Sequence, residues 1–217
     1  MDHKPIYWEY FRLEESAYRD KVKMYEDNSE QIAVLLFEDK FEIDIDYLFC
    51  LFEIGRYERF LSKVNPLVEL VIMENIYDYR GVDIYKELLF RKAACHYQLH
   101  QYDQAGTILK QLISMDKSNP YYMGLYRICL RKTHNDIYLS FKAMAIASFI
   151  IVLGITVARI LLEPLFQYYF APFIVLRTGL LIVAISLLVG IESFFQYKIY
   201  KETGMFSFKL VNRIFGI

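Results

Sequence analysis

The chain has 217 residues, and its 25 basic and 26 acidic side chains leave a formal net charge of −1. More than half of the residues are hydrophobic and 17% are aromatic, which excludes a disordered or low-complexity protein. The near-neutral charge argues against nucleic acid as a partner, because phosphate backbones are bound by basic surfaces. The composition therefore predicts a folded protein that does not bind nucleic acid.

The first part of the chain, residues 1–138, is acidic and has the pattern of helices. It carries 18 basic and 23 acidic side chains, and residues 1–46 alone carry 6 basic and 13 acidic. Apolar residues recur every three or four positions with few Gly or Pro residues between them, which predicts an all-α domain. We interpret the acidic side chains of residues 1–46 as a solvated helical face.

One segment of this domain departs from the helical spacing. Apolar and acidic residues alternate over Phe41–Asp46, a pattern that would also suit a short strand. We interpret the segment instead as the start of the next helix, with Asp44 or Asp46 accepting its first backbone N–H groups as the N-cap.

Two segments of the domain are similar to each other, Asp46–Leu70 and Phe90–Pro120. Each holds a helix, a short polar break, a tyrosine followed by an acidic residue, and a second helix. The later segment resembles a tetratricopeptide repeat, with Ala93 at the small position of the first helix, Tyr102 opening the second, and Ala105 as its small packing residue. The resemblance implies a solenoid of antiparallel helix pairs in which these three residues pack the pair together.

The later segment also departs from the repeat family. Lys92, His96 and Lys117 stand where the family has leucine, tyrosine and proline. Tyr57 and Tyr102 are 45 residues apart, whereas the family period is about 34. The resemblance is therefore degenerate and covers only part of the chain.

The resemblance further implies a concave surface that is lined by the first helix of each pair and binds a protein partner. The candidate protein-binding residues on this surface are Phe49, Phe52, Glu53, Ala94, Tyr97 and Gln98. The alternative is that the aromatic members of this set belong to the core of the solenoid.

Two apolar runs follow the acidic domain. Ala143–Leu162 and Phe170–Ile191 each contain a single charged residue. About 20 apolar residues in a helix span the hydrocarbon core of a bilayer. The sequence therefore predicts a transmembrane hairpin over residues 139–192, with spans at about 143–162 and 170–191 and a short loop at 163–172.

The charges that flank the spans predict their orientation. Basic residues flank the ends of both spans that lie away from the loop: Arg131, Lys132 and Lys142 precede the first span, and Lys198, Lys201, Lys209 and Arg213 follow the second. The loop has no Lys or Arg, so both termini are expected in the cytoplasm, with a bacterial inner membrane favoured and no signal peptide. Residues 193–217 interleave basic and aromatic side chains, as in an amphipathic tail that lies on the inner leaflet.

Four charged residues lie in or beside the predicted spans: Arg159, Glu163, Arg177 and Glu192. Charges inside a bilayer are expensive and therefore suggest a function. We favour anchoring at the interfaces, with Arg159 pairing with Glu163 four residues on, over an ion pathway.

Ser186 and Gly190 form a pair of small residues four positions apart in the second span. Such a pair allows close helix packing. It could pack against Ala147 or Gly154 of the first span, or it could mediate association between copies of the chain.

No pattern of catalytic or metal-ligating residues emerges. The three cysteines are scattered, and His96 and His100 lack further ligands with suitable spacing. We therefore predict a protein that is not an enzyme and needs no metal or cofactor. The favoured function is a membrane-anchored helical-repeat adaptor whose partners are a cytoplasmic protein, the lipid bilayer and a second copy of itself. The alternative is an oligomeric membrane effector or channel whose cytoplasmic domain senses a signal.

Overall fold

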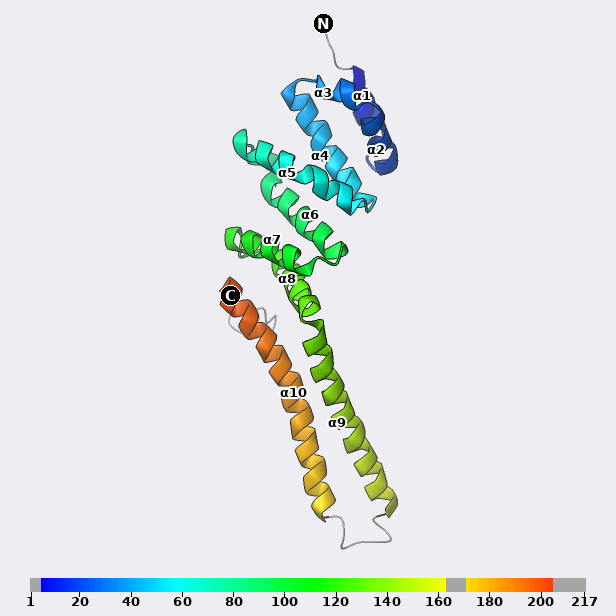
Figure 1. Ribbon diagram of the computed structural model, residues 1–217, viewed down its shortest axis with the longest axis vertical. Coiled ribbons are helices and arrows are strands. Elements are labelled where there is room, and N and C mark those ends of the chain that lie inside the picture. The colour runs from blue at the N-terminus through cyan, green and yellow to red at the C-terminus, as the bar shows by residue number, and fades with distance from the viewer. Residues whose placement is uncertain (1–4, 163–170, 205–217) are drawn as a thin grey trace. The chain divides into compact units, whose positions relative to one another are not determined.

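The computed structural model describes residues 5–162 and 171–204 of the chain. The chain divides into two compact units, Met1–Tyr126 and Arg127–Ile217. The described residues are mostly helical, as predicted, with a single two-stranded hairpin among them (Figure 1). The elements are α1 (Pro5–Arg12), α2 (Tyr18–Asp27), α3 (Ser29–Ala33), α4 (Phe37–Glu53), α5 (Tyr57–Met73), β1 (Asp78–Tyr79), β2 (Val82–Asp83), α6 (Ile84–Gln98), α7 (Tyr102–Met115), α8 (Pro120–Thr133), α9 (Asn135–Leu162) and α10 (Ala171–Thr203).

Helices that follow one another in the first unit pack on one another. Contacts join α2 to α4, α4 to α5, α5 to α6 and α6 to α7, and Figure 1 shows α4 to α7 arranged in chain order. Ala93 in α6 and Ala105 in α7 are fully buried, and Tyr102 is the first residue of α7. The core between α4, α5 and α6 is formed by Ile45, Leu48, Leu51, Phe60, Val64 and Leu88.

Three of these helices end in the same way. Gly55, Asn75 and His100 follow α4, α5 and α6 with positive φ angles of 76°, 58° and 61°. At the end of α6, the N–H of Gln101 donates to the carbonyl of His96 at 2.9 Å. This bond to the residue five positions back, together with the left-handed residue, is the Schellman arrangement, which stops a helix and turns the chain.

The segment Phe41–Asp46 lies inside α4, so its interpretation as the start of a helix capped by Asp44 or Asp46 is wrong. The N-cap is Leu36, which makes no side-chain capping bond. Phe41, Ile43 and Ile45 are all buried although alternate residues point to nearly opposite sides of a helix. The alternation therefore reflects a helix that is covered on opposite sides, by α2 and α5 among others.

A small hairpin joins α5 to α6, where the sequence predicted no strand. Tyr79 pairs with Val82, and the two turn residues between them, Arg80 and Gly81, have φ angles of 55° and 80°. Two consecutive residues with positive φ are typical of the type I′ turn. Asp83 then caps α6 by accepting a hydrogen bond from the backbone N–H of Lys86 at 3.1 Å.

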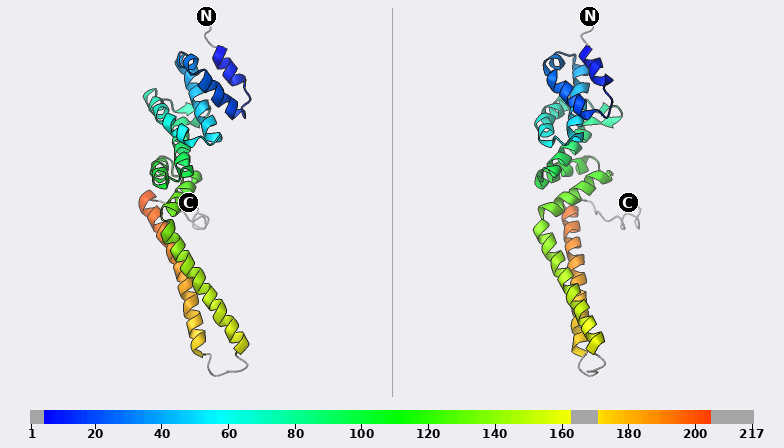
Figure 2. Two further views of the ribbon diagram at one scale, coloured as in Figure 1. Left: turned by 45° about the vertical axis from the view of Figure 1, so that its right-hand side comes forward. Right: turned by 90° about the vertical axis from the view of Figure 1, so that its right-hand side faces the viewer.

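In the second unit, α9 and α10 lie side by side along their length (Figures 1 and 2). Both are long and apolar enough to cross a membrane, over Asn135–Leu161 and Ile174–Thr203, and only 11% of each apolar window is buried. The core helix of a soluble protein would be mostly buried. The buried apolar side chains of the two helices are Ala145, Val152, Ala184, Ile191, Phe195 and Ile199, and the polar side chain of Gln196 is also buried.

Candidate functional site

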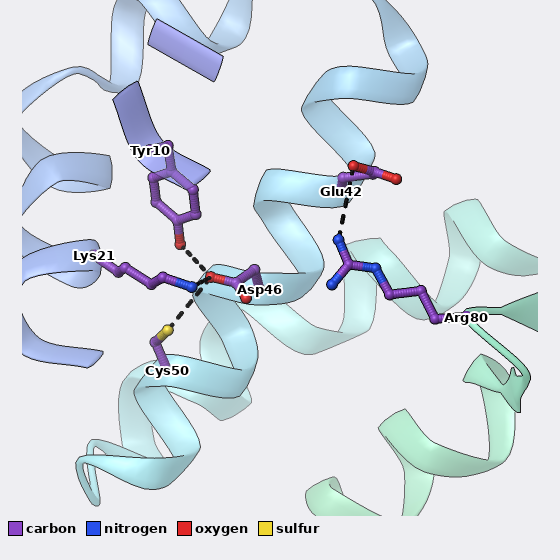
Figure 3. Close-up of polar contacts among 6 residues, drawn as sticks. All are labelled: Tyr10, Lys21, Glu42, Asp46, Cys50 and Arg80. Atoms are coloured by element: carbon purple, nitrogen blue, oxygen red, sulfur yellow. Dashed lines mark hydrogen bonds and ion pairs between the residues drawn. The ribbon is translucent and has the colours of Figure 1, made fainter. Parts of the chain in front are cut away.

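A buried polar cluster joins α1, α2 and α4. One carboxylate oxygen of Asp46 accepts from the ammonium of Lys21 at 3.1 Å, from the hydroxyl of Tyr10 at 3.0 Å and from the thiol of Cys50 at 3.6 Å (Figure 3). The side chain of Lys21 is only 4% exposed and Tyr10 is fully buried. The cluster therefore fixes the two N-terminal helices to α4.

The electrostatics of this cluster fit a structural role. Burial, together with the neighbouring Asp46 carboxylate, raises the pKa of the Cys50 thiol to about 12. The same causes raise the pKa of Tyr10 far above its usual value. Both groups are thus protonated donors near neutral pH, whereas a nucleophilic cysteine has a lowered pKa.

Two further carboxylates of α4 also bond tyrosines from the N-terminal helices. The hydroxyl of Tyr7 donates to Glu42 at 2.6 Å, and the hydroxyl of Tyr25 donates to Asp44 at 2.7 Å. Glu42 also lies 4.0 Å from the guanidinium of Arg80 in the hairpin (Figure 3). The interpretation of the acidic stretch as a solvated face is therefore wrong for α4, since these carboxylates are partly buried and hydrogen-bonded. The tyrosines of α1 and α2 supply these hydrogen bonds, and no local spacing in the sequence links them to α4.

A pocket of about 280 Å³ lies beside this cluster, between α4, the β1–β2 hairpin and α6. It is called the α4–α6 pocket below. Its lining is apolar in the main, with two basic and two acidic side chains: Ile45, Asp46, Phe49, Tyr79, Arg80, Val82, Ile84, Glu87 and Arg91.

Arg91 of α6 lines one side of the pocket, and its guanidinium contacts α4. Its guanidinium lies 4.2 Å from the ring centroid of Phe49 and 4.9 Å from that of Phe52. It donates to Glu53 at 3.1 Å and to Glu87 at 2.6 Å. The three candidate binding residues of α4 are therefore brought together around Arg91, which the sequence did not single out.

The candidate binding residues of α6 lie apart from the pocket lining. Ala94 and Tyr97 are partly buried and Gln98 is exposed. The ring of Tyr97 lies 5.7 Å from that of Tyr102, the first residue of α7. Phe49 is thus the predicted residue that lines the pocket, and Arg80 and Glu87 are lining residues that only the fold brings to it.

The charged residues of the α9–α10 hairpin lie in separate environments. Glu192 accepts two contacts from Nη2 of Arg131, at 2.6 and 2.9 Å. Arg159 in α9 and Arg177 in α10 are partly buried. Glu163, the predicted partner of Arg159, lies outside the described residues.

Ser186 and Gly190 are exposed on α10. A Cβ atom added at Gly190 would meet nothing within 4 Å, and the same holds for Gly154 in α9. The interpretation of Ser186 and Gly190 as the packing surface inside the hairpin is therefore wrong, because Ala184 and Ile191 are the buried residues in this part of α10. Association between copies of the chain stays a prediction for this face.

No protein-family model, no curated protein and no solved structure matches this chain. The resemblance to tetratricopeptide repeats therefore stays a prediction. Within residues 5–162 and 171–204, no three His, Cys, Asp or Glu side chains are grouped to hold a metal ion.

Proposed function

We propose that this protein is a membrane-anchored helical adaptor that binds a segment of a partner protein in the α4–α6 pocket. The observation that carries this proposal is the composition of the pocket. The lining is mainly apolar, includes Arg80 and Arg91, and contains Phe49, one of the three candidate binding residues of α4. The other two, Phe52 and Glu53, contact Arg91. Concave sites of this kind, mostly apolar with a few placed polar groups, are typical of ligand recognition.

The lining indicates which partner chemistry fits. Ile45, Phe49 and Val82 can receive an apolar side chain, and Val82 is 48% exposed. Arg80 has a side chain 61% exposed, with a long contact to Glu42 at 4.0 Å and its guanidinium 5.8 and 5.1 Å from the ring centroids of Phe11 and Tyr79. A guanidinium in this position can turn to a carboxylate of a partner. The expected ligand is therefore a segment with an apolar anchor next to an acidic residue.

The backbone of Arg80 supports a role for its side chain. Arg80 has a φ of 55°, and a left-handed conformation costs a side-chain-bearing residue about 1 kcal/mol. Asn or Gly would fit the turn better. A strained arginine at an exposed pocket rim is expected where the side chain itself is needed.

The hairpin α9–α10 supplies the anchor in this proposal. The basic residues at the loop-distal ends of both helices favour an orientation with both termini in the cytoplasm, and a bacterial inner membrane suits this arrangement. The pocket then faces cytoplasmic proteins. The stacked helix pairs of the first unit suit such a repeat-like scaffold.

Site-specific photo-cross-linking in native membranes tests the proposal. A photoreactive residue at Val82, in the pocket, is expected to capture a discrete partner, whereas one at Gln104, exposed on α7, is the matched control. The Val82 product is expected to disappear when Phe49→Ala is added. Equal products at both positions, or a product that survives Phe49→Ala, would contradict the pocket.

A second candidate is an oligomeric membrane effector, favoured by the exposed small residues of the hairpin. Cβ atoms added at Gly154, Gly179 or Gly190 would meet nothing within 4 Å, so another helix could approach closely there. In that case Gly190→Leu should dissociate a detergent-stable oligomer and abolish dye leakage from vesicles. A monomer in mild detergent would exclude this candidate.

A further inference from the structure

We infer that the base of the α9–α10 hairpin binds the phosphate group of an anionic phospholipid. This inference rests on the proposed insertion of the hairpin into a membrane. The site is the cluster formed by Arg127, Arg131, Tyr138, Lys142 and Lys198 around Glu192, called the basal cluster below.

The basal cluster is built from residues spaced to lie on one side of α8 and α9, facing α10. Arg131 contacts Glu192 of α10 at 2.6 Å, and its guanidinium lies 5.6 Å from the ring centroid of Tyr138. The ammonium of Lys142, one turn further on, lies 5.9 Å from the same ring. Lys198 of α10 lies 2.5 Å from the imidazole of His134.

The cluster carries more positive than negative charge. The cluster holds the four cations of Arg127, Arg131, Lys142 and Lys198 and one carboxylate, that of Glu192, which contacts Arg131 at 2.6 Å. Burial, and after it repulsion from Arg131, lowers the pKa of the Arg127 guanidinium. Arg127 and Arg131 are partly buried and repel each other, which favours a bound anion that accepts hydrogen bonds from both. The oxygens of a phosphate diester can accept such bonds.

The position of the cluster indicates a lipid rather than a free phosphate. Lys142 directly precedes the apolar run that begins at Ala143, and Glu192 directly follows the run that ends at Ile191. The basal cluster therefore stands at the boundary between headgroups and acyl chains in the proposed orientation. The tails of a lipid bound there can lie along exposed apolar side chains such as Ile146 and Val189.

The test is native mass spectrometry of the full-length protein with added phosphatidylglycerol or phosphatidylcholine. The wild type should retain phosphatidylglycerol selectively. Each cation is expected to contribute about fivefold to the retention of the anionic lipid. The double variant Lys142→Gln with Lys198→Gln should therefore lower this retention about 25-fold. The matched control, Lys132→Gln with Lys201→Gln, removes the same charge from two exposed lysines outside the cluster and should change retention little.

A further variant separates binding from a merely structural role. Glu192→Gln removes the carboxylate that competes with the phosphate, so it should increase retention of phosphatidylglycerol, whereas loss of a purely structural ion pair would not. Equal losses in the two lysine pairs would overturn the site in favour of general surface charge. Displacement of the lipid by millimolar inorganic phosphate would show that the site binds free phosphate rather than a lipid. Release of the protein from membranes by alkaline carbonate would instead refute membrane insertion, and with it the proposed anchor.

Discussion

The ammonium of Lys21 and the carboxylate of Asp46 form an ion pair at 3.1 Å in which the lysine side chain is 4% exposed and the aspartate side chain 21%. The pair joins α2 to α4, the helix that also contributes Phe49 to the α4–α6 pocket. The position of one pocket wall therefore depends on this buried contact.

Removal of one partner should be strongly destabilising. We expect Lys21→Met to lower the free energy of unfolding by about 3–5 kcal/mol, because it leaves a carboxylate without its buried cation. Adding Asp46→Leu should recover only part of this loss, because the buried hydroxyl of Tyr10 then loses its acceptor. The measurement is thermal unfolding of the full-length protein in detergent.

Lys40 provides the control for this prediction. It pairs with Asp44 at 2.8 Å, but its side chain is 41% exposed. Lys40→Met should therefore change stability by no more than about 0.5 kcal/mol. Equal effects of Lys21→Met and Lys40→Met would show that burial does not govern the Lys21 pair.

Alkaline pH should destabilise the fold through its buried thiols. Burial raises the pKa of Cys50 and of Cys95 to about 12, from an ordinary value of 9.0. The folded state then favours the protonated thiols. Their contribution to the free energy of unfolding is complete below about pH 9 and is lost as the pH rises towards 12. The midpoint temperature of thermal unfolding should decrease as the pH is raised from about 9 to about 11. The decrease should be less steep in Cys95→Ala. A midpoint that is flat or rises over this range would be the contrary result.

A glycine after the end of α6 should stabilise the protein. His100 has a φ of 61°, and glycine is the residue that best tolerates this left-handed position. His100→Gly should raise the unfolding free energy by about 1 kcal/mol, even though it removes a bond to Tyr102. Gly55→Ala at the equivalent position after α4 should lower it by a similar amount. Calorimetry of the two variants checks both signs.

Arg80 should show a trade-off between stability and binding. Arg80→Asn replaces a strained residue by one that suits a type I′ turn, so it should stabilise the protein by about 0.5–1 kcal/mol. The same change removes the cation at the pocket rim and should weaken partner binding at least tenfold. Titration of the captured partner segment, alongside thermal unfolding, measures both effects. A variant that is more stable and binds equally well would remove Arg80 from the site.

Much of the fold was accessible from sequence because local spacing determines it. Long apolar runs predicted the hairpin helices, and the three-to-four spacing predicted the helices of the first unit. The alternation in α4 was misleading because that helix is buried on opposite sides, which erases the one-sided pattern. The β1–β2 hairpin was not predicted because its strands have two residues each and its turn is Arg-Gly rather than Asn-Gly.

The candidate site was less accessible, because its contacts join distant parts of the chain. Arg91 contacts Glu53, which is 38 residues away, and Lys21 contacts Asp46, which is 25 residues away. No local pattern distinguishes Arg91 from a solvated helical arginine. Phe49 was predicted only through the repeat resemblance.

The most direct test of the adaptor function is mass determination of the intact complex, purified from native membranes in mild detergent. The comparison includes the wild type, Val82→Glu, which places a carboxylate at the pocket, and Gln104→Glu, which adds the same charge on α7. The account predicts a foreign polypeptide at fixed stoichiometry in the wild type and in Gln104→Glu, and its loss in Val82→Glu. A homo-oligomer alone in the wild type, or a partner that Val82→Glu retains, would contradict it.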